Sequence, residues 1–380
     1  MRKLLVILGA PIDDINMDEA LNRIDNFIQI GRATQKGHQI ATINADFVVK
    51  SLADPELRRI LQEADMATAD GMPLVWSARL LGVPLEGRVT GADMVPALAK
   101  RAAERGYSIY FLGAAPGVAE QAAAVLRQLY PDLKIAGCSA PSRDEVENNT
   151  AAIVASCRAA QPDILLVAFG NPKQEKWIYE HANQLNVPVM MGVGGTFDFI
   201  AGVTKRAPNW MQESGLEWLY RLLSEPRRLW KRYATDLVGF GFFFLWQWWV
   251  MQRGATTRAV LPKADFFIVK DTVIMNVQGH LDSSNQRAFA EKATQSLSTH
   301  PYLILNLANA EFLDSSAIGT LVALTKQARD DGGNLWLVNV PSTIVNVLSL
   351  LRLEQFFDIC EDVDSALQTR TTVSRVGVPA

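Results

Sequence analysis

The stretch "DILLVAFGNPKQEKW", residues 163–177, joins a run of branched apolar residues to a polar turn and the start of a helical pattern. Through the first 200 residues or so, comparable runs alternate with helical stretches such as residues 54–64 and 118–129. The runs read "KLLVIL", "QIATIN", "YSIYFLG", "LKIAG", "DILLVAFG" and "VPVMMGVGG". Strand and helix in repetition predict an α/β domain with a mostly parallel sheet that helices cover on both faces.

The bulk composition indicates a globular protein of two or three domains. Of its 380 residues 49% are hydrophobic and 20% are charged, so disorder is not expected. The formal net charge of -3 gives no general basic surface, and no nucleic-acid partner is expected. The cysteines, Cys138, Cys157 and Cys360, are far apart and form no CxxC pair, which argues against a disulfide framework or a zinc site. A reducing cytoplasm fits best.

The amino-terminal residues imitate a signal peptide only briefly. Two cations precede a short apolar run, but the run breaks at Pro11 and turns acidic at once. The apolar core of a signal peptide takes roughly 7 to 15 residues, so this run is too short. We expect a first strand over residues 3–8 and no secretion signal.

A different composition begins near Gly215. Residues 215–253 place apolar and aromatic side chains on one side of a helical pattern and arginines and lysines on the other. Basic residues opposite aromatics predict a helix on a membrane surface, and a core helix with a solvated charged face is the alternative. The expected division is therefore a domain over 1–214, this basic and aromatic segment over 215–253, a linker over 254–264, and a second small α/β domain over 265–372.

The most apolar part of that segment, residues 237–251, is 15 residues long, or about 22 Å as a helix. A bilayer core is roughly 30 Å thick and needs about 20 residues. Gln247 and the three tryptophans within four positions also suit an interface better than a bilayer centre. We expect an interfacial anchor, and a re-entrant or spanning arrangement stays open.

Polar residues gather where the predicted strands of the first domain end. The segments are "TINADF", "TADGMPLVW", "GRVTGADM", "FGNPKQEKW" and "GVGGTFDFIAGVTKRAP", and "FLGAAPGVAEQAA" adds a glycine turn before a helix. Ligands of such sheets bind beyond the carboxyl ends of the strands. The glycine turn, which begins at Gly113, could present backbone N–H groups to a diphosphate, although many such turns are only tight connections.

In this order and spacing, the segments resemble the WecG/TagA/CpsF family of bacterial glycosyltransferases, over about residues 4–233. The resemblance implies a Rossmann-like domain and an inverting enzyme that moves a sugar from a UDP-sugar to a saccharide on undecaprenyl diphosphate. Such enzymes work at the cytoplasmic face of the inner membrane and build precursors of capsule, exopolysaccharide and other envelope polysaccharides. A peripheral or monotopic location there is expected.

Asp70 matches the catalytic aspartate of that family and is the candidate base for the acceptor hydroxyl. It precedes a glycine, which lets a substrate approach the backbone, although an aspartate in "DGMP" is also a good helix N-cap. Other residues match family positions in the pocket or have side chains suited to sugar or phosphate. These candidate substrate-binding residues are Thr42, Asn44, Arg88, Gly113, Gln174, Glu175, Gly194, Gly195 and Asp198.

The expected chemistry needs no cofactor besides the UDP-sugar donor. The sequence shows no cluster of histidine, cysteine and carboxylate ligands and no convincing DxD motif, so cationic side chains and N–H groups are expected to stabilise the leaving group without a required metal. In the family a basic carboxyl-terminal appendage is thought to close over the site and contact the lipid diphosphate. The arginines of this segment that could bind anionic headgroups and substrate in that way are Arg221, Arg227, Arg228 and Arg232.

Residues 265–372 resemble a STAS domain, the fold of bacterial anti-sigma factor antagonists. The segments "VQGHLDSSN" and "YLILNLANAEFLDSSAIGTLVAL" carry this resemblance. It implies Ser315 as a candidate for phosphorylation by an anti-sigma-type kinase, where roughly -1.5 to -2 added charges beside Asp282 and Asp314 would act as a switch. The alternative is that Asp314 and Ser315 only cap a helix.

Two functions stay open at this level. The first is a membrane-associated hexosyltransferase with a STAS module for regulation or docking, and the second is an inactive transferase that brings a signalling domain to the membrane. The joint presence of the candidate pocket residues favours the enzyme. A transporter is not expected because transporters with STAS domains need many spanning helices. The donor (an N-acetylmannosamine-, uronic acid- or hexose-type sugar), the acceptor glycan, the STAS partner and a homo-oligomeric state are left undetermined by the sequence.

Overall fold

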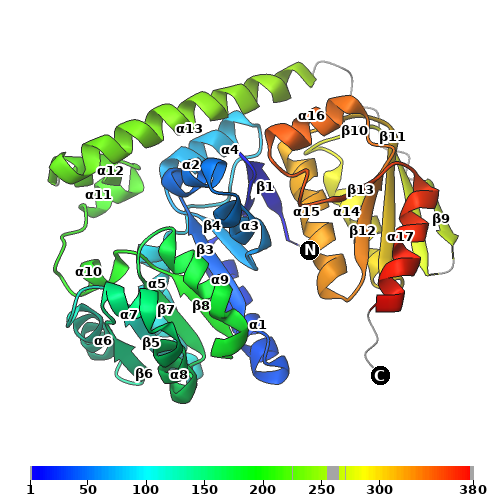
Figure 1. Ribbon diagram of the computed structural model, residues 1–380. Coiled ribbons are helices and arrows are strands. Elements are labelled where there is room, and N and C mark those ends of the chain that lie inside the picture. Colours follow the sequence, from blue (N-terminus) through cyan, green and yellow to red (C-terminus); the bar gives the residue numbers. More distant parts are fainter. Residues whose placement is uncertain (1, 225, 255–264, 270, 377–380) are drawn as a thin grey trace. The chain divides into compact units, whose positions relative to one another are not determined.

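The computed structural model describes residues 2–224, 226–254, 265–269 and 271–376 (Figure 1). They form two compact units. The large unit holds residues 15–76 and 85–240, and the small unit holds the described parts of 1–14, 77–84 and 241–380. These units differ from the division expected from the sequence, because residues 2–14, residues 77–84 and the last third of the basic and aromatic segment, from residue 241, pack with the carboxyl-terminal domain.

The large unit is built on a parallel sheet with the strand order β4-β3-β8-β7-β5-β6. Its strands are β3 (His38–Ile43), β4 (Met66–Ala69), β5 (Ser108–Gly113), β6 (Lys134–Ser139), β7 (Ile164–Ala168) and β8 (Val189–Gly192). The predicted parallel α/β fold is confirmed. Strand β4 was not among the predicted runs, because its four residues include two alanines and so give a weak apolar signal.

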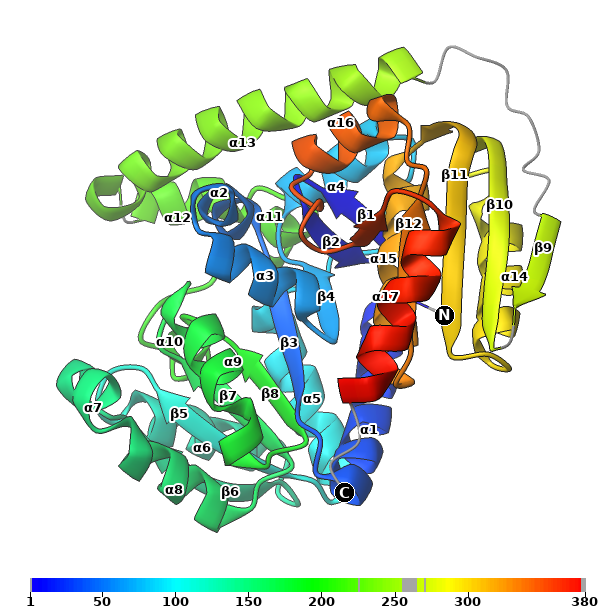
Figure 2. The same ribbon diagram turned by 45° about the vertical axis from the view of Figure 1, so that its right-hand side comes forward.

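Helices cover both faces of this sheet (Figures 1 and 2). Alternate side chains of β7 point to opposite faces, so Ile164 and Leu166 join one apolar cluster while Leu165 and Val167 join another. The first cluster is covered by α1 (Met17–Thr34), α5 (Gly91–Arg105), α6 (Val118–Leu129) and α10 (Thr196–Ile200), and the second by α8 (Thr150–Ala160) and α9 (Lys173–Leu185). The polar strand ends are thereby left at one edge of the sheet, where the candidate site lies.

The remaining helices before residue 225 form connections and the segment that follows the sheet. They are α2 (Ala45–Ala53), α3 (Pro55–Glu63), α4 (Met72–Leu80), α7 (Arg143–Asn148), α11 (Asn209–Glu213) and α12 (Glu217–Ser224). Side-chain caps fix several helix starts: the Asn16 side chain accepts from the Glu19 N–H ahead of α1, and Thr90 accepts from the Asp93 N–H at α5.

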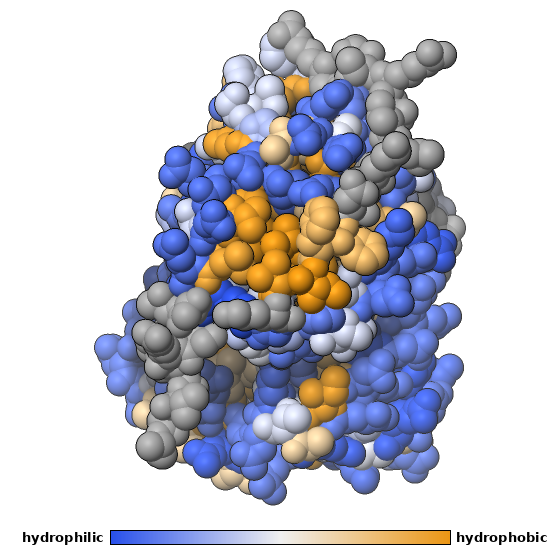
Figure 3. Space-filling model, turned by 90° about the vertical axis from the view of Figure 1, so that its right-hand side faces the viewer, coloured by the Kyte–Doolittle hydropathy of each residue, from blue (hydrophilic) through white to orange (hydrophobic). Residues whose placement is uncertain are grey.

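The carboxyl-terminal domain contains a second sheet, with the strand order β13-β12-β11-β10-β9. The neighbours from β10 to β13 pair in parallel, and β9 is an antiparallel edge strand. The strands are β9 (Asp265–Val269), β10 (Thr272–Leu281), β11 (Tyr302–Leu313), β12 (Asn334–Val338) and β13 (Asp358–Cys360), and the helices are α14 (Gln286–Leu297), α15 (Ser315–Asp330), α16 (Ser342–Leu350) and α17 (Val363–Val376). The predicted small α/β domain is confirmed. Its edge strand β9 exposes Phe266, Phe267, Ile268 and Val269, on the face where Figure 3 shows an apolar patch.

The first strand was predicted for the large parallel sheet, and that placement is wrong. Strand β1 (Leu4–Ile7) instead pairs antiparallel with β2 (Ala10–Asp13) in a two-stranded hairpin of the small unit. Its two turn residues, Leu8 and Gly9, have φ angles of 50° and 84°, the left-handed values that a tight hairpin turn requires. A leucine in place of the usual asparagine or glycine hides this turn from sequence inspection.

The aromatic run lies in α13 (Pro226–Gly254), a helix of 29 residues that is longer than the run itself. Its buried side chains include Phe240, Phe244, Gln247 and Met251, which recur at helical spacing. An exposed apolar stripe recurs at the same spacing and consists of Val238, Phe242, Leu245, Trp246 and Trp249. Among the described residues, none of the helices has the length and hydropathy needed to cross a bilayer. Interfacial anchoring by α13 stays a prediction.

Candidate active site

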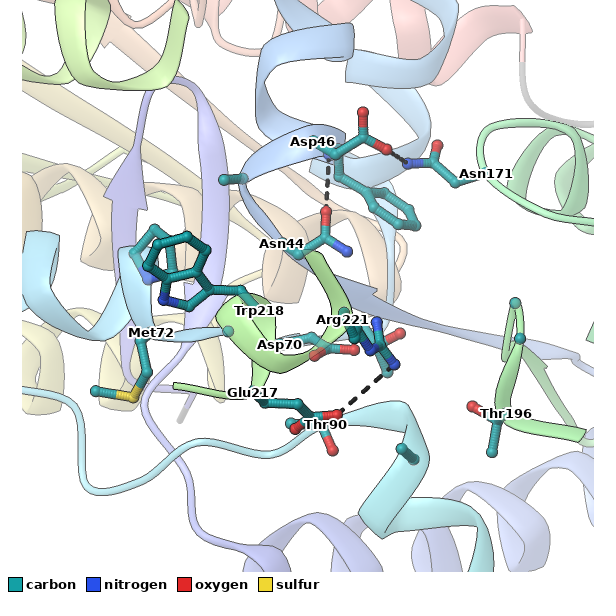
Figure 4. Close-up of a pocket in the computed structure, with 18 of the residues that line it drawn as sticks. Asn44, Asp46, Asp70, Met72, Thr90, Asn171, Thr196, Glu217, Trp218 and Arg221 are labelled. Carbon is teal, nitrogen blue, oxygen red and sulfur yellow. Dashed lines mark hydrogen bonds and ion pairs between the residues drawn. The ribbon is translucent and has the colours of Figure 1, made fainter. Parts of the chain in front are cut away.

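A cavity of about 710 Å³ opens in the large unit and receives residues that follow β3, β4, β7 and β8 (Figure 4). Thr42, Asn44, Asp70, Arg88 and Gln174 all line it. Gly194, Gly195, Asp198 and Arg221 line it as well. The strand-end segments singled out in the sequence are thus brought together around one space, as expected for a parallel sheet.

Asp70 lies at the end of β4, where its backbone N–H donates to the carbonyl oxygen of Ile43 at 2.7 Å. One carboxylate oxygen accepts from the backbone N–H of Gly91 at 3.3 Å. Burial in the cavity raises the pKa of Asp70 to about 6, and the nearby Glu217 carboxylate adds to the rise, while Arg221 and Arg88 oppose it. A carboxyl with this pKa is ionised at neutral pH and is a stronger base than an ordinary aspartate.

Thr42 and Asn44 come from the end of β3 and the start of α2. The side-chain oxygen of Asn44 accepts from the backbone N–H of Phe47 at 3.1 Å, which caps α2 and fixes the amide group at the cavity wall. Thr42 is buried beside Gly91, and a side chain at Gly91 would meet its hydroxyl. The Asn44 side chain is therefore held in place before any ligand arrives.

Gln174 ties two loops of the cavity together. Its side-chain oxygen accepts from the backbone N–H groups of Gly170 at 3.1 Å and Gly194 at 3.0 Å. Its Nε2 donates to the carboxylate of Glu175 at 2.7 Å. Glu175 is buried behind it, and burial raises the pKa of Glu175 to about 7 while the bond from Gln174 opposes the rise. Glu175 thus orients the amide of Gln174 and does not itself line the cavity.

Three guanidinium groups converge on Glu217, the first residue of α12. Its carboxylate lies 3.6 Å from Arg88, 3.5 Å from Arg206 and 3.7 Å from Arg221. Arg206 also pairs with Asp93 at 2.6 Å, and although burial by itself raises the pKa of Asp93, hydrogen bonds from Arg206 and Thr90 hold it below its ordinary value. A carboxylate that attracts several arginines marks a place where a second anion, such as a phosphate group, would also be stabilised.

The segment after the sheet closes one side of the cavity. Trp218, Arg221 and Leu222 of α12 line it together with Trp230 and Phe240 of α13. The guanidinium of Arg221 lies over the ring of Phe199, 4.6 Å from its centroid.

The other arginines predicted for lipid contact are placed differently. Arg227 is exposed and does not line the cavity, and the side chains of Arg228 and Arg232 lie outside the described residues. A role of these three residues at the lipid diphosphate stays a prediction.

Gly113, another candidate substrate residue, is not among the cavity residues. It has a φ of 100°, and a side chain there would come within 2.9 Å of the backbone of Ala168 in the neighbouring strand. This close backbone packing explains why position 113 is a glycine. Binding of substrate at the Gly113 turn stays a prediction.

The model of the Glycosyl transferase WecG/TagA/CpsF family matches residues 5–254. The chain belongs to the WecG/TagA/CpsF glycosyltransferase family. It is 32% identical over 197 residues to the N-acetylglucosaminyldiphosphoundecaprenol N-acetyl-beta-D-mannosaminyltransferase of Bacillus spizizenii, covering 52% of this chain and 75% of that protein. A Staphylococcus aureus (strain MW2) protein of the same name is 32% identical over 225 residues, covering 59% and 85%.

The STAS domain model matches residues 264–366 of this glycosyltransferase. Solved structures similar to this part include an anti-sigma factor antagonist from Mycobacterium paratuberculosis, with 19% identity, a TM-score of 0.27, and coverage of 29% of this chain and 93% of that chain. Ser315, the phosphorylation candidate, begins α15 and is only 3% exposed. Asp314 caps the same helix by accepting from the N–H groups of Ser316 and Ala317. Capping by Asp314 is therefore present, and phosphorylation of Ser315 stays a prediction.

The described residues were also compared with the geometry of a metal site. Over the described part of the chain, no three His, Cys, Asp or Glu side chains are grouped so as to hold a metal ion. The cations at the cavity are guanidinium groups. Independence from a divalent metal stays a prediction.

Sequence reasoning missed several cavity residues of the transferase. Glu217 lies in a stretch dominated by apolar and basic residues, so the helical pattern drew attention only to the charges of the opposite sign. Asp46 and Asn171 line the cavity and are joined by a 3.1 Å hydrogen bond. Both lie inside the quoted strand-end segments, and attention to every polar residue there would have found them.

Replacing Gln174 by alanine is expected to raise the KM of the transferase roughly tenfold while kcat falls less. The change leaves the N–H groups of Gly170 and Gly194 without their partner, and a buried unpaired donor costs about 1–3 kcal/mol. Steady-state kinetics check this. Glu175→Gln is the matched control, since its amide oxygen still accepts from Gln174. Equal KM values for Gln174→Ala and the unchanged protein would contradict a role in shaping the site.

Proposed function

We propose that this transferase moves an N-acetylmannosamine-type sugar from a UDP-sugar to a saccharide on undecaprenyl diphosphate, with inversion at the sugar carbon. The observation that carries the proposal is the single cavity lined by Thr42, Asn44, Asp70, Arg88 and Gln174. The names of the relatives support the acceptor class and the type of sugar. Measuring UDP release from a panel of UDP-sugars, with a lipid-linked N-acetylglucosamine diphosphate as acceptor, tests it, and release that is independent of the acceptor would count against it.

In this mechanism Asp70 accepts the proton of the acceptor hydroxyl. The hydroxyl oxygen forms a bond to the anomeric carbon from one face while the bond from that carbon to the UDP oxygen breaks on the other. The pKa of about 6 keeps Asp70 ionised at neutral pH and able to take the proton. Burial of the carboxylate with one N–H donor, from Gly91, leaves its other oxygen available for the acceptor.

Negative charge develops on the departing diphosphate, and arginines suit its stabilisation. Arg88 and Arg221 line the cavity and share Glu217 as a counter-ion. A diphosphate offers these guanidinium groups more negative charge than one carboxylate does, so it competes with Glu217 for them. Neutralisation of this kind lowers the barrier most when the cations are already positioned in a site that excludes water.

The activity is expected to fall as pH drops through about 6. A base works only when deprotonated, and the raised pKa of Asp70 means that its ionised fraction is lost below about pH 6 instead of below its ordinary value. In Glu217→Gln the acidic limb of the kcat/KM profile should move to lower pH, because a neighbouring negative charge that favours protonated Asp70 is gone. A pH–rate profile of both proteins measures this, and superimposable acidic limbs would contradict the assignment.

A lipid-linked acceptor requires the cavity to work at a membrane surface. The apolar stripe of α13 supports such a location, since exposed tryptophans and phenylalanine at helical spacing suit the bilayer interface. Phe244 and Met251 of the same helix are buried in the protein and cannot serve this purpose. We assign the stripe to the cytoplasmic membrane face.

Replacing Phe242, Trp246 and Trp249 together by glutamate should weaken binding to anionic phospholipid vesicles at least about tenfold. Each aromatic side chain withdrawn from the interface forfeits on the order of 1.5–3 kcal/mol of apolar burial. Vesicle flotation of the purified chain measures this. The matched control is Phe266→Glu with Phe267→Glu, which alters equally exposed aromatics on β9. Equal loss of binding in both variants would contradict a specific role for α13.

A further inference from the structure

The amino-terminal hairpin packs against helix α15 of the STAS domain, inside the small unit. Leu4 and Val6 of β1 belong to the same buried apolar cluster as Ile318 and Leu321 of α15. All four side chains are at most 5% exposed. A two-stranded hairpin is at best marginally stable by itself, so this contact contributes to holding β1 and β2 in place.

Gly319 allows the hairpin to approach the helix closely. A Cβ atom added at Gly319 would lie 1.9 Å from the carbonyl oxygen of Leu4, a separation that neither backbone tolerates. Gly319 is buried within α15, where alanine would otherwise be the better helix former. The glycine therefore marks a surface shaped for the β1 backbone.

Gln247 joins the hairpin, α13 and α15 at one point. Its side-chain oxygen accepts from the N–H of Leu8 at 2.8 Å, and its Nε2 donates to the carbonyl of Val6 at 3.0 Å and to the hydroxyl of Ser315 at 3.2 Å. The residue is fully buried. A glutamine inside the aromatic run is thus explained by three hydrogen bonds within the protein.

The same contacts cover Ser315. Its hydroxyl is buried, bonded to Gln247, and close to the hairpin backbone that Gln247 also holds. A phosphate group would add roughly -1.5 to -2 charges, and enclosing such charge away from water is costly. Phosphorylation at Ser315 and docking of the hairpin therefore exclude each other.

We propose that the face of α15 that carries Ser315 is an internal docking surface whose occupant is the chain's own hairpin, Leu4–Asp13. Two observations identify the occupant. Gly319 leaves room for the backbone of Leu4, and the side-chain amide of Gln247 forms hydrogen bonds with the backbone of Val6 and Leu8. Residues 5–13 and Gln247 lie in the segment matched by the transferase family. The transferase part of the chain thereby contacts the STAS domain at this surface. A kinase or other protein that binds at Ser315 must first displace the hairpin.

Gly319→Ala in the full-length chain tests the docking. Hydrogen exchange followed by mass spectrometry is expected to show amides of residues 4–13 exchanging at least tenfold faster than in the unchanged protein. Gly241→Ala is the matched control, because it alters a helical glycine of α13 whose added Cβ meets no atom within 4 Å. Unchanged hairpin protection in Gly319→Ala, or a raised melting temperature as for an unhindered helical alanine, would overturn the proposal.

A second measurement covers the case in which Gly319→Ala disturbs the STAS domain itself, which loss of protection in β11 would reveal. Ser315→Cys reports the exposure of position 315 through its rate of thiol alkylation, read by peptide mapping. Adding Gln247→Ala removes the three hydrogen bonds without adding volume, and the alkylation rate should rise at least tenfold. Equal rates in the presence and absence of Gln247 would overturn the proposal.

Discussion

Replacing Asp70 by asparagine should lower kcat by about 10²- to 10⁴-fold, the range that loss of a general base produces. Asparagine keeps the size of the side chain and can still accept from the N–H of Gly91, so the cavity should keep its shape. It cannot take the proton of an acceptor hydroxyl. The KM values for donor and acceptor should change little, since the loss falls on the transition state.

Two controls separate chemistry from folding in that experiment. The melting temperature of Asp70→Asn should not fall, because a buried carboxylate is exchanged for a neutral group of equal size. Asp93→Asn changes a second carboxylate near the cavity that pairs with Arg206 and is not placed to act as base. If the two variants lost activity equally, or if Asp70→Asn retained full transfer, Asp70 would not be the base.

Replacing Arg221 by alanine should reduce kcat/KM roughly 10²-fold, comparable to removing one preorganised donor from a transition-state site. Arg221 reaches the cavity from α12 and shares Glu217 with Arg88 and Arg206. Its loss removes one positive charge and leaves the ring of Phe199 uncovered. Lysine should restore only part of the activity, because a single ammonium cannot form the two parallel bonds of a guanidinium to phosphate.

The control for Arg221 is Arg127→Ala on α6, an exposed arginine that does not line the cavity. Kinetics with a water-soluble acceptor analogue remove the membrane from the comparison. Equal activity of Arg221→Ala and Arg127→Ala would show that α12 takes no part in the reaction. A raised KM with an unchanged kcat would mean that Arg221 stabilises the bound substrate and the transition state equally.

Much of the fold follows from local patterns that the sequence displays. The runs around Leu165, Met190 and Ile109 are apolar on both sides, as strands covered on both faces must be. The grouping of the candidate site residues was predictable for the same reason, since strand ends of a parallel sheet meet at one edge and polar residues there become neighbours. Asp70, Asn44 and Gln174 could be named on that basis together with the family resemblance.

Contacts between distant segments were not predictable in this way. Nothing local distinguishes Glu217 from a solvated helix residue, and its meaning comes from arginines 11 and 129 positions earlier in the chain, Arg206 and Arg88. Gln247 was interpreted as an interfacial residue, whereas its partners, Leu8 and Ser315, lie 239 and 68 positions away. These partners are brought together only by tertiary packing. The periodic pattern of a single segment therefore cannot predict them.

The most direct test of the central claim is a single transfer reaction. Purified protein is mixed with UDP-N-acetylmannosamine and a lipid-linked N-acetylglucosamine diphosphate, and the lipid product is followed by mass spectrometry and its anomeric configuration by NMR. The proposal predicts a disaccharide with inverted, β configuration that is formed by the unchanged protein and is reduced by orders of magnitude in Asp70→Asn. A product with retained configuration, or no transfer from any UDP-sugar by well-folded protein, would contradict it.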